Sequence, residues 1–217
     1  MSELAISSTH WLAISLRNGA AIIFNLNQSS RWQFLKSIEN KNPTPNGNND
    51  EDDDLNRNLI KFSPDGQRLI VNGQSKQINI YRQSDDTWQL ERIIQVRKRA
   101  SAIDLNNNVL LIADKSGDVY KVDLSTVTES NNTITLTAED CLMGHLSMLL
   151  EIVFVQTNDK QSFILTGDRD EKIRLSHYPN AYNIQGYCLG HTEFVSHVKL
   201  IGNDQILSAS GDGKIVC

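Results

Sequence analysis

Cysteine is scarce in this chain. The 217 residues include three cysteines, Cys141, Cys188 and Cys217, and their spacing does not match that of a metal site. An odd number of cysteines is also a poor basis for a disulfide framework. We therefore expect a reducing compartment and no bound metal.

Long apolar runs are absent. No stretch approaches the ~18 consecutive apolar residues that a membrane-spanning helix needs. The N-terminus lacks the basic segment and the apolar core of a signal peptide. We therefore expect a soluble protein with no membrane contact, located in the cytosol or the nucleus, with the choice between the two left open.

Sequence signatures of catalysis are missing too. The chain has no G-x-S-x-G, no H-E-x-x-H, no cysteine pair and no glycine-rich phosphate loop that leads into a helix. We therefore predict that the protein is not an enzyme and binds no cofactor.

Positive charge is in deficit. Lys and Arg number 21 against 26 Asp and Glu, and the net charge is −5. No broad basic stripe is visible, so we expect few direct contacts with nucleic-acid phosphates.

Short strand-like runs separated by turn residues fill the chain. No window has the apolar period of a helix, so we predict an all-β fold. The clearest unit begins at Gly190-His191. An inner strand from Val195, a second strand ending in Ser208-Ala209-Ser210 and a turn with Asp212 follow. This order is typical of one blade of a WD-repeat β-propeller.

Three polar residues of this blade are expected to bond to one another. In such blades the His donates toward the turn Asp, and a strand Ser or Thr also bonds the His. Leaving one of these groups buried and unpaired would cost ~1–3 kcal/mol. We therefore predict a structural relay of His191, Ser208 and Asp212.

A second copy of the pattern begins at Gly144-His145. It predicts a relay of His145, Thr166 and Asp170, with Ser176 where Trp is usual. A catalytic or metal site is the alternative interpretation of these His and Asp residues. We favour the structural one, because the set recurs once per blade.

Three weaker copies precede these two. Turn positions equivalent to Asp170 and Asp212 fall at Asn18, Ser75 and Ser116. Two of the four spacings match the ~40–45 residues of such repeats. The other two spacings are longer, because each contains an insertion. Residues 40–58 are Asn-rich and then acidic, and residues 126–138 are rich in Thr, Ser and Asn.

The two insertions are expected to be irregular. We predict that residues 40–58 are disordered and that residues 126–138 form a polar loop. The acidic run at 50–54 could act as an arm that mimics or repels nucleic acid, but a solvated loop is the preferred interpretation.

Two charged stretches stand out from generic blades. Arg97-Lys98-Arg99 precedes the inner strand of the third blade, and Asp168 to Arg174 has a charged residue at nearly every position. Arg169 and Arg174 carry planar guanidinium groups that suit carboxylates or phosphates. Solvated turns and a partner surface both remain open.

These stretches carry a resemblance to a known family. Residues 168–179 and 187–196, together with Gly144 to Leu150 and Lys98-Arg99, resemble the WD-repeat non-catalytic subunit of the eukaryotic tRNA (guanine-N7-)-methyltransferase complex. The absence of Trp at Ser176 is also typical of that family. The resemblance spans Arg97 to Cys217.

The resemblance implies a scaffold. In this family a seven-bladed propeller binds and stabilises a separate Rossmann-fold subunit. That subunit uses S-adenosylmethionine to form N7-methylguanosine in the variable loop of tRNA, which is reached only through the complex. The residues implied at this interface or in its support are Lys98, Arg99, Asp168, Arg169, Lys172 and Arg174.

The length predicts a partial propeller. About five blades of the expected seven fit into residues 1–217, so we expect an open or truncated disc formed as one domain. A generic WD-repeat adaptor of a ubiquitin ligase or a chromatin complex is the alternative function.

Overall fold

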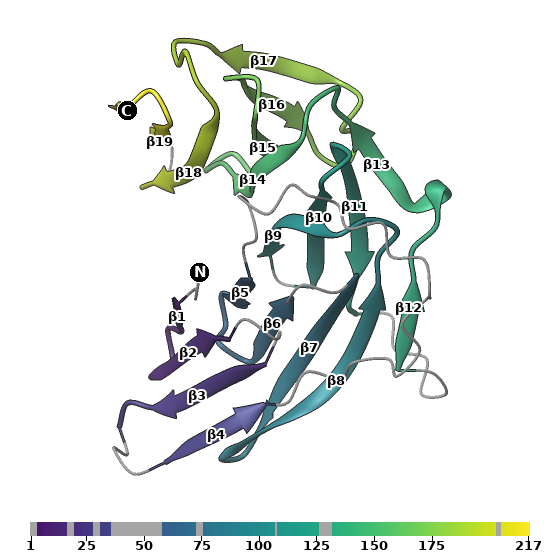
Figure 1. The fold of residues 1–217 in the computed structure, drawn as a ribbon, viewed down its shortest axis with the longest axis vertical. Coiled ribbons are helices and arrows are strands. Elements are labelled where there is room, and N and C mark those ends of the chain that lie inside the picture. The colour runs from purple at the N-terminus through teal and green to yellow at the C-terminus, as the bar shows by residue number, and fades with distance from the viewer. Residues whose placement is uncertain are drawn as a thin grey trace. The chain divides into compact units, whose positions relative to one another are not determined.

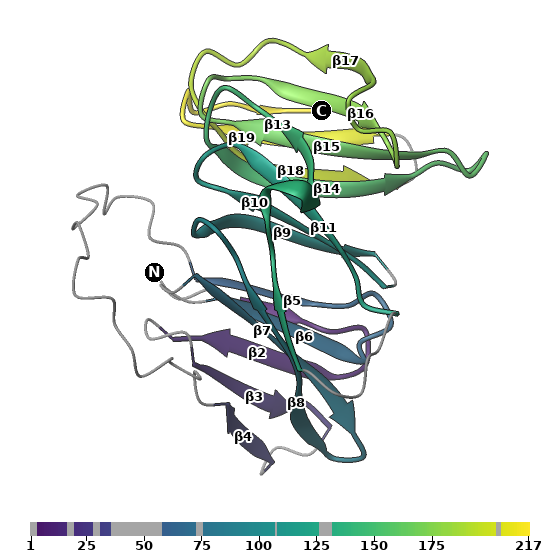
Figure 2. The same cartoon turned by 90° about the vertical axis from the view of Figure 1, so that its right-hand side faces the viewer.

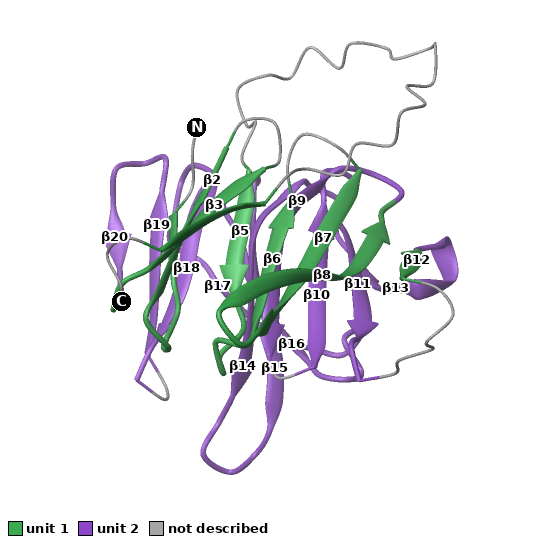
Figure 3. Ribbon diagram, turned by 90° about the horizontal axis from the view of Figure 1, so that it is seen from below, with its two compact units in different colours: residues 1–96, 129–135 green, residues 97–128, 136–217 purple. Residues whose placement is uncertain are grey.

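The computed structural model describes residues 4–16, 20–27, 31–35, 58–72, 76–106, 108–125, 132–202 and 205–217, most of them in β-strands (Figure 1). The chain divides into two compact units (Figure 3). Unit 1 comprises residues 1–96 and 129–135, and unit 2 comprises residues 97–128 and 136–217. The sequence suggested a single domain, because the same repeat runs through both units and gives no signal of the division.

Unit 1 contains two sheets (Figure 2). Their strands are antiparallel and follow one another along the chain, except for β12, which is added in parallel beside β8. In the first sheet the order is β1-β2-β3-β4, and in the second it is β12-β8-β7-β6-β5. The strands are β1 Leu4–Ile6, β2 Trp11–Ser15, β3 Ala21–Asn25, β4 Trp32–Leu35, β5 Leu59–Phe62, β6 Arg68–Asn72, β7 Gln77–Ser84, β8 Thr87–Gln95 and β12 Thr133–Thr135.

The core of unit 1 lies between these two sheets. Along β2, buried residues alternate with less buried ones, as expected of a strand that covers a core with one face. Trp88 of β8 packs edge-on against Trp11 of β2, with ring centroids 5.7 Å apart, and lies 5.6 Å from Phe62 of β5. Aromatic contacts thus join neighbouring blades.

Unit 2 contains three sheets, ordered β13-β11-β10-β9, β14-β15-β16-β17 and β18-β19-β20. The only helical turn among its described residues is a 3-10 turn at Ala138–Asp140. The strands are β9 Ala100–Asn106, β10 Val109–Asp114, β11 Asp118–Asp123, β13 Cys141–Gly144, β14 Leu149–Gln156, β15 Ser162–Asp168, β16 Ile173–His177, β17 Ile184–Cys188, β18 Val195–Ile201, β19 Gln205–Ser210 and β20 Ile215–Val216.

Neighbouring sheets of unit 2 pack through two apolar clusters. One joins β9–β11 to β14 and β15, and the other joins β14–β16 to β18. A buried polar contact adds to the first: Asp104 Oδ2 of β9 accepts the N–H of Phe154 of β14 at 2.6 Å. Since Asp104 is itself buried, this bond fixes one inner strand beside the next.

The predicted fold class is confirmed: the described chain is all-β and forms five sheets in the manner of propeller blades. We number the blades along the chain: blade one is β1–β4, blade two is β5–β8 with β12, blade three is β9–β11 with β13, blade four is β14–β17 and blade five is β18–β20. Both insertions differ in detail from what the sequence predicted. Asn58 is buried and donates from Nδ2 to the carbonyl oxygen of Leu16 at 2.7 Å, so it belongs to the sheet region and not to a disordered insertion. Residues 40–57 lie outside the described residues, as do the turn positions Asn18 and Ser75.

The described part of the second insertion is not all loop. Residues 133–135 form β12, which pairs in parallel with residues 93–95 of β8. Residues 126–131 lie outside the described part. Across the ranges described above, no helix has the length and apolar character needed to cross a bilayer.

Candidate partner-binding surface

Blade five brings together the relay predicted there. His191 Nδ1 lies 3.1 Å from Asp212 Oδ2, and Nε2 lies 2.9 Å from Ser208 Oγ. Burial alone would raise the pKa of Asp212. Hydrogen bonds from the N–H of Lys214, from His191 and from the N–H of Thr192 outweigh it and lower the pKa to about 2. Asp212 is therefore a carboxylate that holds the imidazole inside its own blade.

Blade four does not close the predicted relay. His145 Nε2 lies 2.9 Å from Thr166 Oγ1, but the buried Nδ1 has no hydrogen-bond partner among the described residues. Asp170 is exposed and does not reach the ring. The tight turn explains the difference, because a second acidic residue, Asp168, accepts the N–H of Lys172 at 2.9 Å and Asp170 is left at the surface.

Burial and a neighbouring cation keep His145 neutral. Burial lowers the pKa of this imidazole most, and the charge of Arg174 lowers it further, to about 4. Among the described residues no carboxylate bonds to its Nδ1, so the ring lacks the orienting partner that a catalytic histidine usually has.

Arg174 was expected at the interface or in its support, and the structure places it inside the protein. The residue is 9% exposed. Its Nε donates to Ser176 Oγ at 2.9 Å, one terminal nitrogen donates to the carbonyl of Gly144 at 3.1 Å, and the other donates to the carbonyl of Ala181 at 3.2 Å. The guanidinium thus ties β16 to the end of β13, and the missing Trp leaves Ser176 as its acceptor.

Asp168 is likewise internal. Its side chain is buried, and this burial raises its pKa although the N–H of Lys172 bonds to it. The equivalent residue in blade three, Asp114, accepts from the N–H of Ser116 at 2.7 Å and of Asp118 at 3.2 Å. Asp114 was not predicted from the sequence, although aligning the two turns identifies it as the counterpart of Asp168.

The other predicted contact residues lie at or near the surface. Lys98, Arg169 and Lys172 are exposed, and Arg99 is half-buried. In Lys172 the ammonium group donates to the carbonyl of Asp170 at 3.3 Å, which leaves donors free to face solvent.

Backbone hydrogen bonds connect these residues into one rim of unit 2. The carbonyl of Arg99 accepts from Lys115 at 3.2 Å, and the carbonyl of Gly117 accepts from His145 at 2.9 Å. Farther along, the carbonyl of Met148 accepts from Arg169 at 3.0 Å. The connections before the inner strands therefore lie beside the tight turns of blades three and four. We call this rim, which displays Lys98, Arg99, Arg169 and Lys172 and also the exposed Asp170 and Glu171, the cationic rim.

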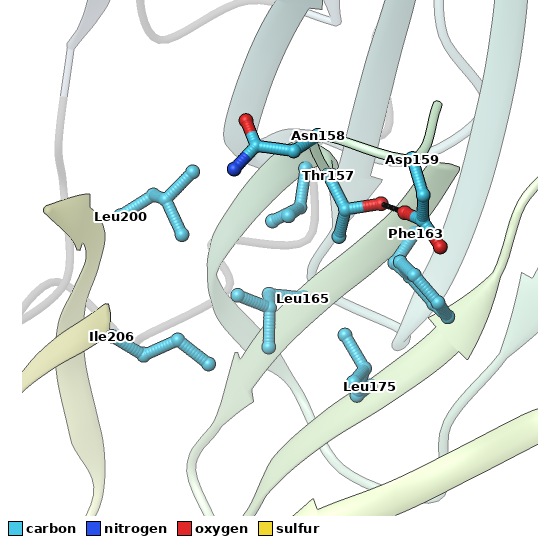
Figure 4. A pocket seen from close by; sticks show the side chains of 9 residues that line it. Thr157, Asn158, Asp159, Phe163, Leu165, Leu175, Leu200 and Ile206 are labelled. Carbon is cyan, nitrogen blue, oxygen red and sulfur yellow. Dashed lines mark hydrogen bonds between the residues drawn. The ribbon is translucent and has the colours of Figure 1, made fainter. Parts of the chain in front are cut away.

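A pocket of about 390 Å³ opens between β14–β16 and β18–β19 of unit 2 (Figure 4). Its walls are apolar, with Phe163, Leu165 and Leu200 among them, and Thr157, Asn158 and Asp159 lie at one side. Thr157 donates its hydroxyl proton to Asp159. The pocket is continuous with the apolar cluster of blades four and five and shows no acid–base pair, and the described residues contain no cluster of metal ligands.

Comparisons with known proteins agree with this architecture. The family described as "tRNA methyltransferase TRM82 WD40 domain" matches residues 25–141 and 129–217. A chain of a structure titled "Crystal Structure of Mitotic Checkpoint Complex" superposes with a TM-score of 0.68 at 18% identity, covering 96% of this chain and 56% of that one. This second match shows the fold alone.

Three curated relatives bear names of the same subunit, "tRNA (guanine-N(7)-)-methyltransferase non-catalytic subunit". The wuho protein of Drosophila erecta is 36% identical and covers 70% of this chain. The TRM82 protein of Saccharomyces cerevisiae (strain RM11-1a) is 33% identical over 73% of the chain, and wdr4 of Dictyostelium discoideum is 33% identical over 72%.

The chain spans 35% of the Drosophila protein and 36% of each of the other two. The family match, by contrast, runs from residue 25 to the last residue and includes the last four blades and the end of the first. The chain therefore belongs to the TRM82 family of WD40 domains.

Proposed function

We propose that the protein is a non-catalytic WD-repeat subunit that binds and stabilises the catalytic subunit of a tRNA (guanine-N7-)-methyltransferase. The observation that carries the proposal is membership of the TRM82 family, with relatives named as this subunit. The catalytic subunit would bind S-adenosylmethionine and form N7-methylguanosine in the variable loop of tRNA. We place the complex in the nucleus.

The cationic rim is the contact surface in this proposal. Lys98, Arg169 and Lys172 present charges to solvent, and a guanidinium such as that of Arg169 bonds a carboxylate through two parallel N–H groups. Asp168 and Arg174 support the rim from within, because they hold the turn and the end of β13. Partner contact and internal support are thus assigned to different residues.

The proposal is tested by co-expressing the chain with the catalytic subunit of its own organism. We expect the two proteins to co-purify and the pair to methylate tRNA at N7 of guanosine faster than the catalytic subunit alone. Arg169→Glu, which reverses a charge on the rim, should weaken co-purification by about tenfold or more, the range found for charge pairs at interfaces.

Lys160→Glu is the matched control, since Lys160 is an exposed cation in the β14–β15 turn and lies outside the rim. Equal loss in both variants would indicate a nonspecific charge effect. A wild-type chain that neither binds the catalytic subunit nor raises methylation would refute the proposed function.

A further inference from the structure

The outer strand of blade four is free of charge. Residues 175–192 contain no Asp, Glu, Lys or Arg, and β17 lies in the middle of this stretch. Among the described residues β17 is the last strand of its sheet. Proteins commonly protect such edges with charged side chains, proline or a covering segment.

The outer strand of blade two shows the usual protection. β8 carries Glu91 and Arg92, and β12 covers its edge by parallel pairing. β17 has neither a charge nor a covering strand among the described residues. The outer strands β4 and β13 also carry no charge, but Arg31 and Asp140 directly precede them. The uncharged stretch around β17 is longer and distinguishes the edge of blade four.

A bulge places two apolar residues of this edge on one face. Ile184 lies opposite Ser176 and Tyr187 lies opposite Arg174, and the register shift takes up the extra residue, Gln185. Since Ser176 and Arg174 share a face of β16, Ile184 and Tyr187 share that face as well. Leu189 follows Tyr187 by two positions, just beyond the end of β17.

These side chains are open to solvent. Ile184 is 41% exposed, Tyr187 is 50% exposed and Leu189 is 74% exposed. Two exposed apolar side chains on one face of a sheet, with a third just beyond its end, are more informative than scattered ones. We call Ile184, Tyr187 and Leu189 the β17 face.

The β17 face rests on a rigid base. Arg174, directly opposite Tyr187, is fixed by its bonds to the carbonyls of Gly144 and Ala181. The face also ends beside the cationic rim, because Cys188 pairs with Ile173, which follows Lys172. Apolar and cationic surfaces are therefore continuous on blade four.

We propose that the β17 face is the apolar centre of the surface that binds the catalytic subunit, an inference that rests on the proposed function. The partner surface would be apolar where it meets Tyr187 and Leu189, and would carry carboxylates where it meets Arg169 and Lys172. Interfaces of this kind have aromatic and aliphatic anchors within a polar edge.

The chemistry of the stretch favours protein over RNA. Aromatic rings can stack on bases, but such sites also need cations along the phosphate backbone. Residues 175–192 supply none, and next to them the exposed Asp170 and Glu171 offset the charges of Arg169 and Lys172. An apolar protein surface can pack against uncharged side chains without burying an unpaired charge. The phosphates of a nucleic acid would find no cation there to neutralise them.

The test measures affinity for the catalytic subunit with two separate variants, Leu189→Lys and Ile184→Ser, by isothermal titration calorimetry. We expect each variant to bind at least about tenfold more weakly than the wild type, as for central interface residues. Trp32→Ser is the matched control, because Trp32 lies on the outer strand β4 of blade one and is 64% exposed. It should bind like the wild type.

Thermal unfolding of each variant shows whether it is folded, and if one is not, the other decides. Wild-type affinity in a folded variant overturns the β17 face while leaving the proposed function intact. A wild type that does not bind overturns both. Two further outcomes with unchanged affinity for the catalytic subunit also overturn the proposal. If the variants weaken tRNA binding by the complex, the face is an RNA site. If they abolish self-association of the chain, the face binds a second copy.

Discussion

Two histidines that occupy the same place in the repeat differ in their bonding partners. His191 is bonded to a carboxylate and a hydroxyl, whereas His145 is bonded to a hydroxyl alone and lies near a cation. One position in the repeat therefore has two environments, and the difference is set by which turn residue reaches the imidazole.

The first prediction concerns acid stability. The pKa of His145 is about 4 in the folded chain against 6.5 for the free side chain. Because folding lowers the pKa of this base, the unfolded chain binds the proton first as the pH falls. The stability contributed by neutral His145 is therefore present above pH 6.5 and is lost as the pH falls toward 4.

His145→Gln should remove that part of the pH dependence, on the order of 2 kcal/mol of unfolding free energy for a partly exposed ring. Urea unfolding of both chains at pH 7.5 and pH 5 gives the comparison. A variant that loses as much stability on acidification as the wild type would assign the effect to another group.

The second prediction separates internal support from surface contact. Arg174→Met removes donors from the carbonyls of Gly144 and Ala181, and leaving such acceptors unpaired costs ~1–3 kcal/mol each. We expect the midpoint of thermal unfolding to fall clearly. Arg169→Met, at an exposed position, should change the unfolding free energy by less than about 0.5 kcal/mol.

Arg174→Lys is a further control on the same site. A single ammonium group cannot reach the three acceptors that the planar guanidinium bonds, so we expect at most partial recovery of stability. Full recovery with Lys would mean that the charge alone matters at this site.

At the scale of elements, the tight turns determine how blades meet. Gly117 has a φ of +89°, and a Cβ added there would lie 2.6 Å from the carbonyl oxygens of both His145 and Ser147. These carbonyls belong to the connection into blade four. The turn of blade three can therefore pack against that connection only if it has no side chain at this position.

The third prediction follows from that contact. Gly117→Ala should destabilise the protein by about 1–3 kcal/mol, because it combines left-handed strain with a clash against backbone. Gly186→Ala is the matched control, since a Cβ at Gly186 meets nothing within 4 Å. Chemical denaturation should show a loss for the first variant and almost none for the second.

At the scale of the whole chain, sequence repetition predicted the blades but not their contacts. Strand positions and turns follow from local alternation and from residues such as His191 and Asp212, whose residue types recur in the preceding blade. The partners of Arg174 are backbone carbonyls of Gly144 and Ala181, which have no sequence signature. Two further features depend on strand register, which the repeat pattern does not specify. One is that Asp168, and not Asp170, accepts the backbone bond in the turn of blade four. The other is the apolar face that the bulge at Gln185 produces.

The route of the chain through β12 also limits how this protein can be divided. After Ser125 of unit 2 the chain contributes β12 to the sheet of unit 1 and then returns to unit 2 at Leu136. A gene split after Val96 would therefore yield a first half in which β8 has lost its parallel neighbour β12. The second half would carry β12 without the strand that it pairs with. The two units are interlaced by sequence, and shuffling blades between relatives would have to exchange residues 129–135 together with residues 1–96.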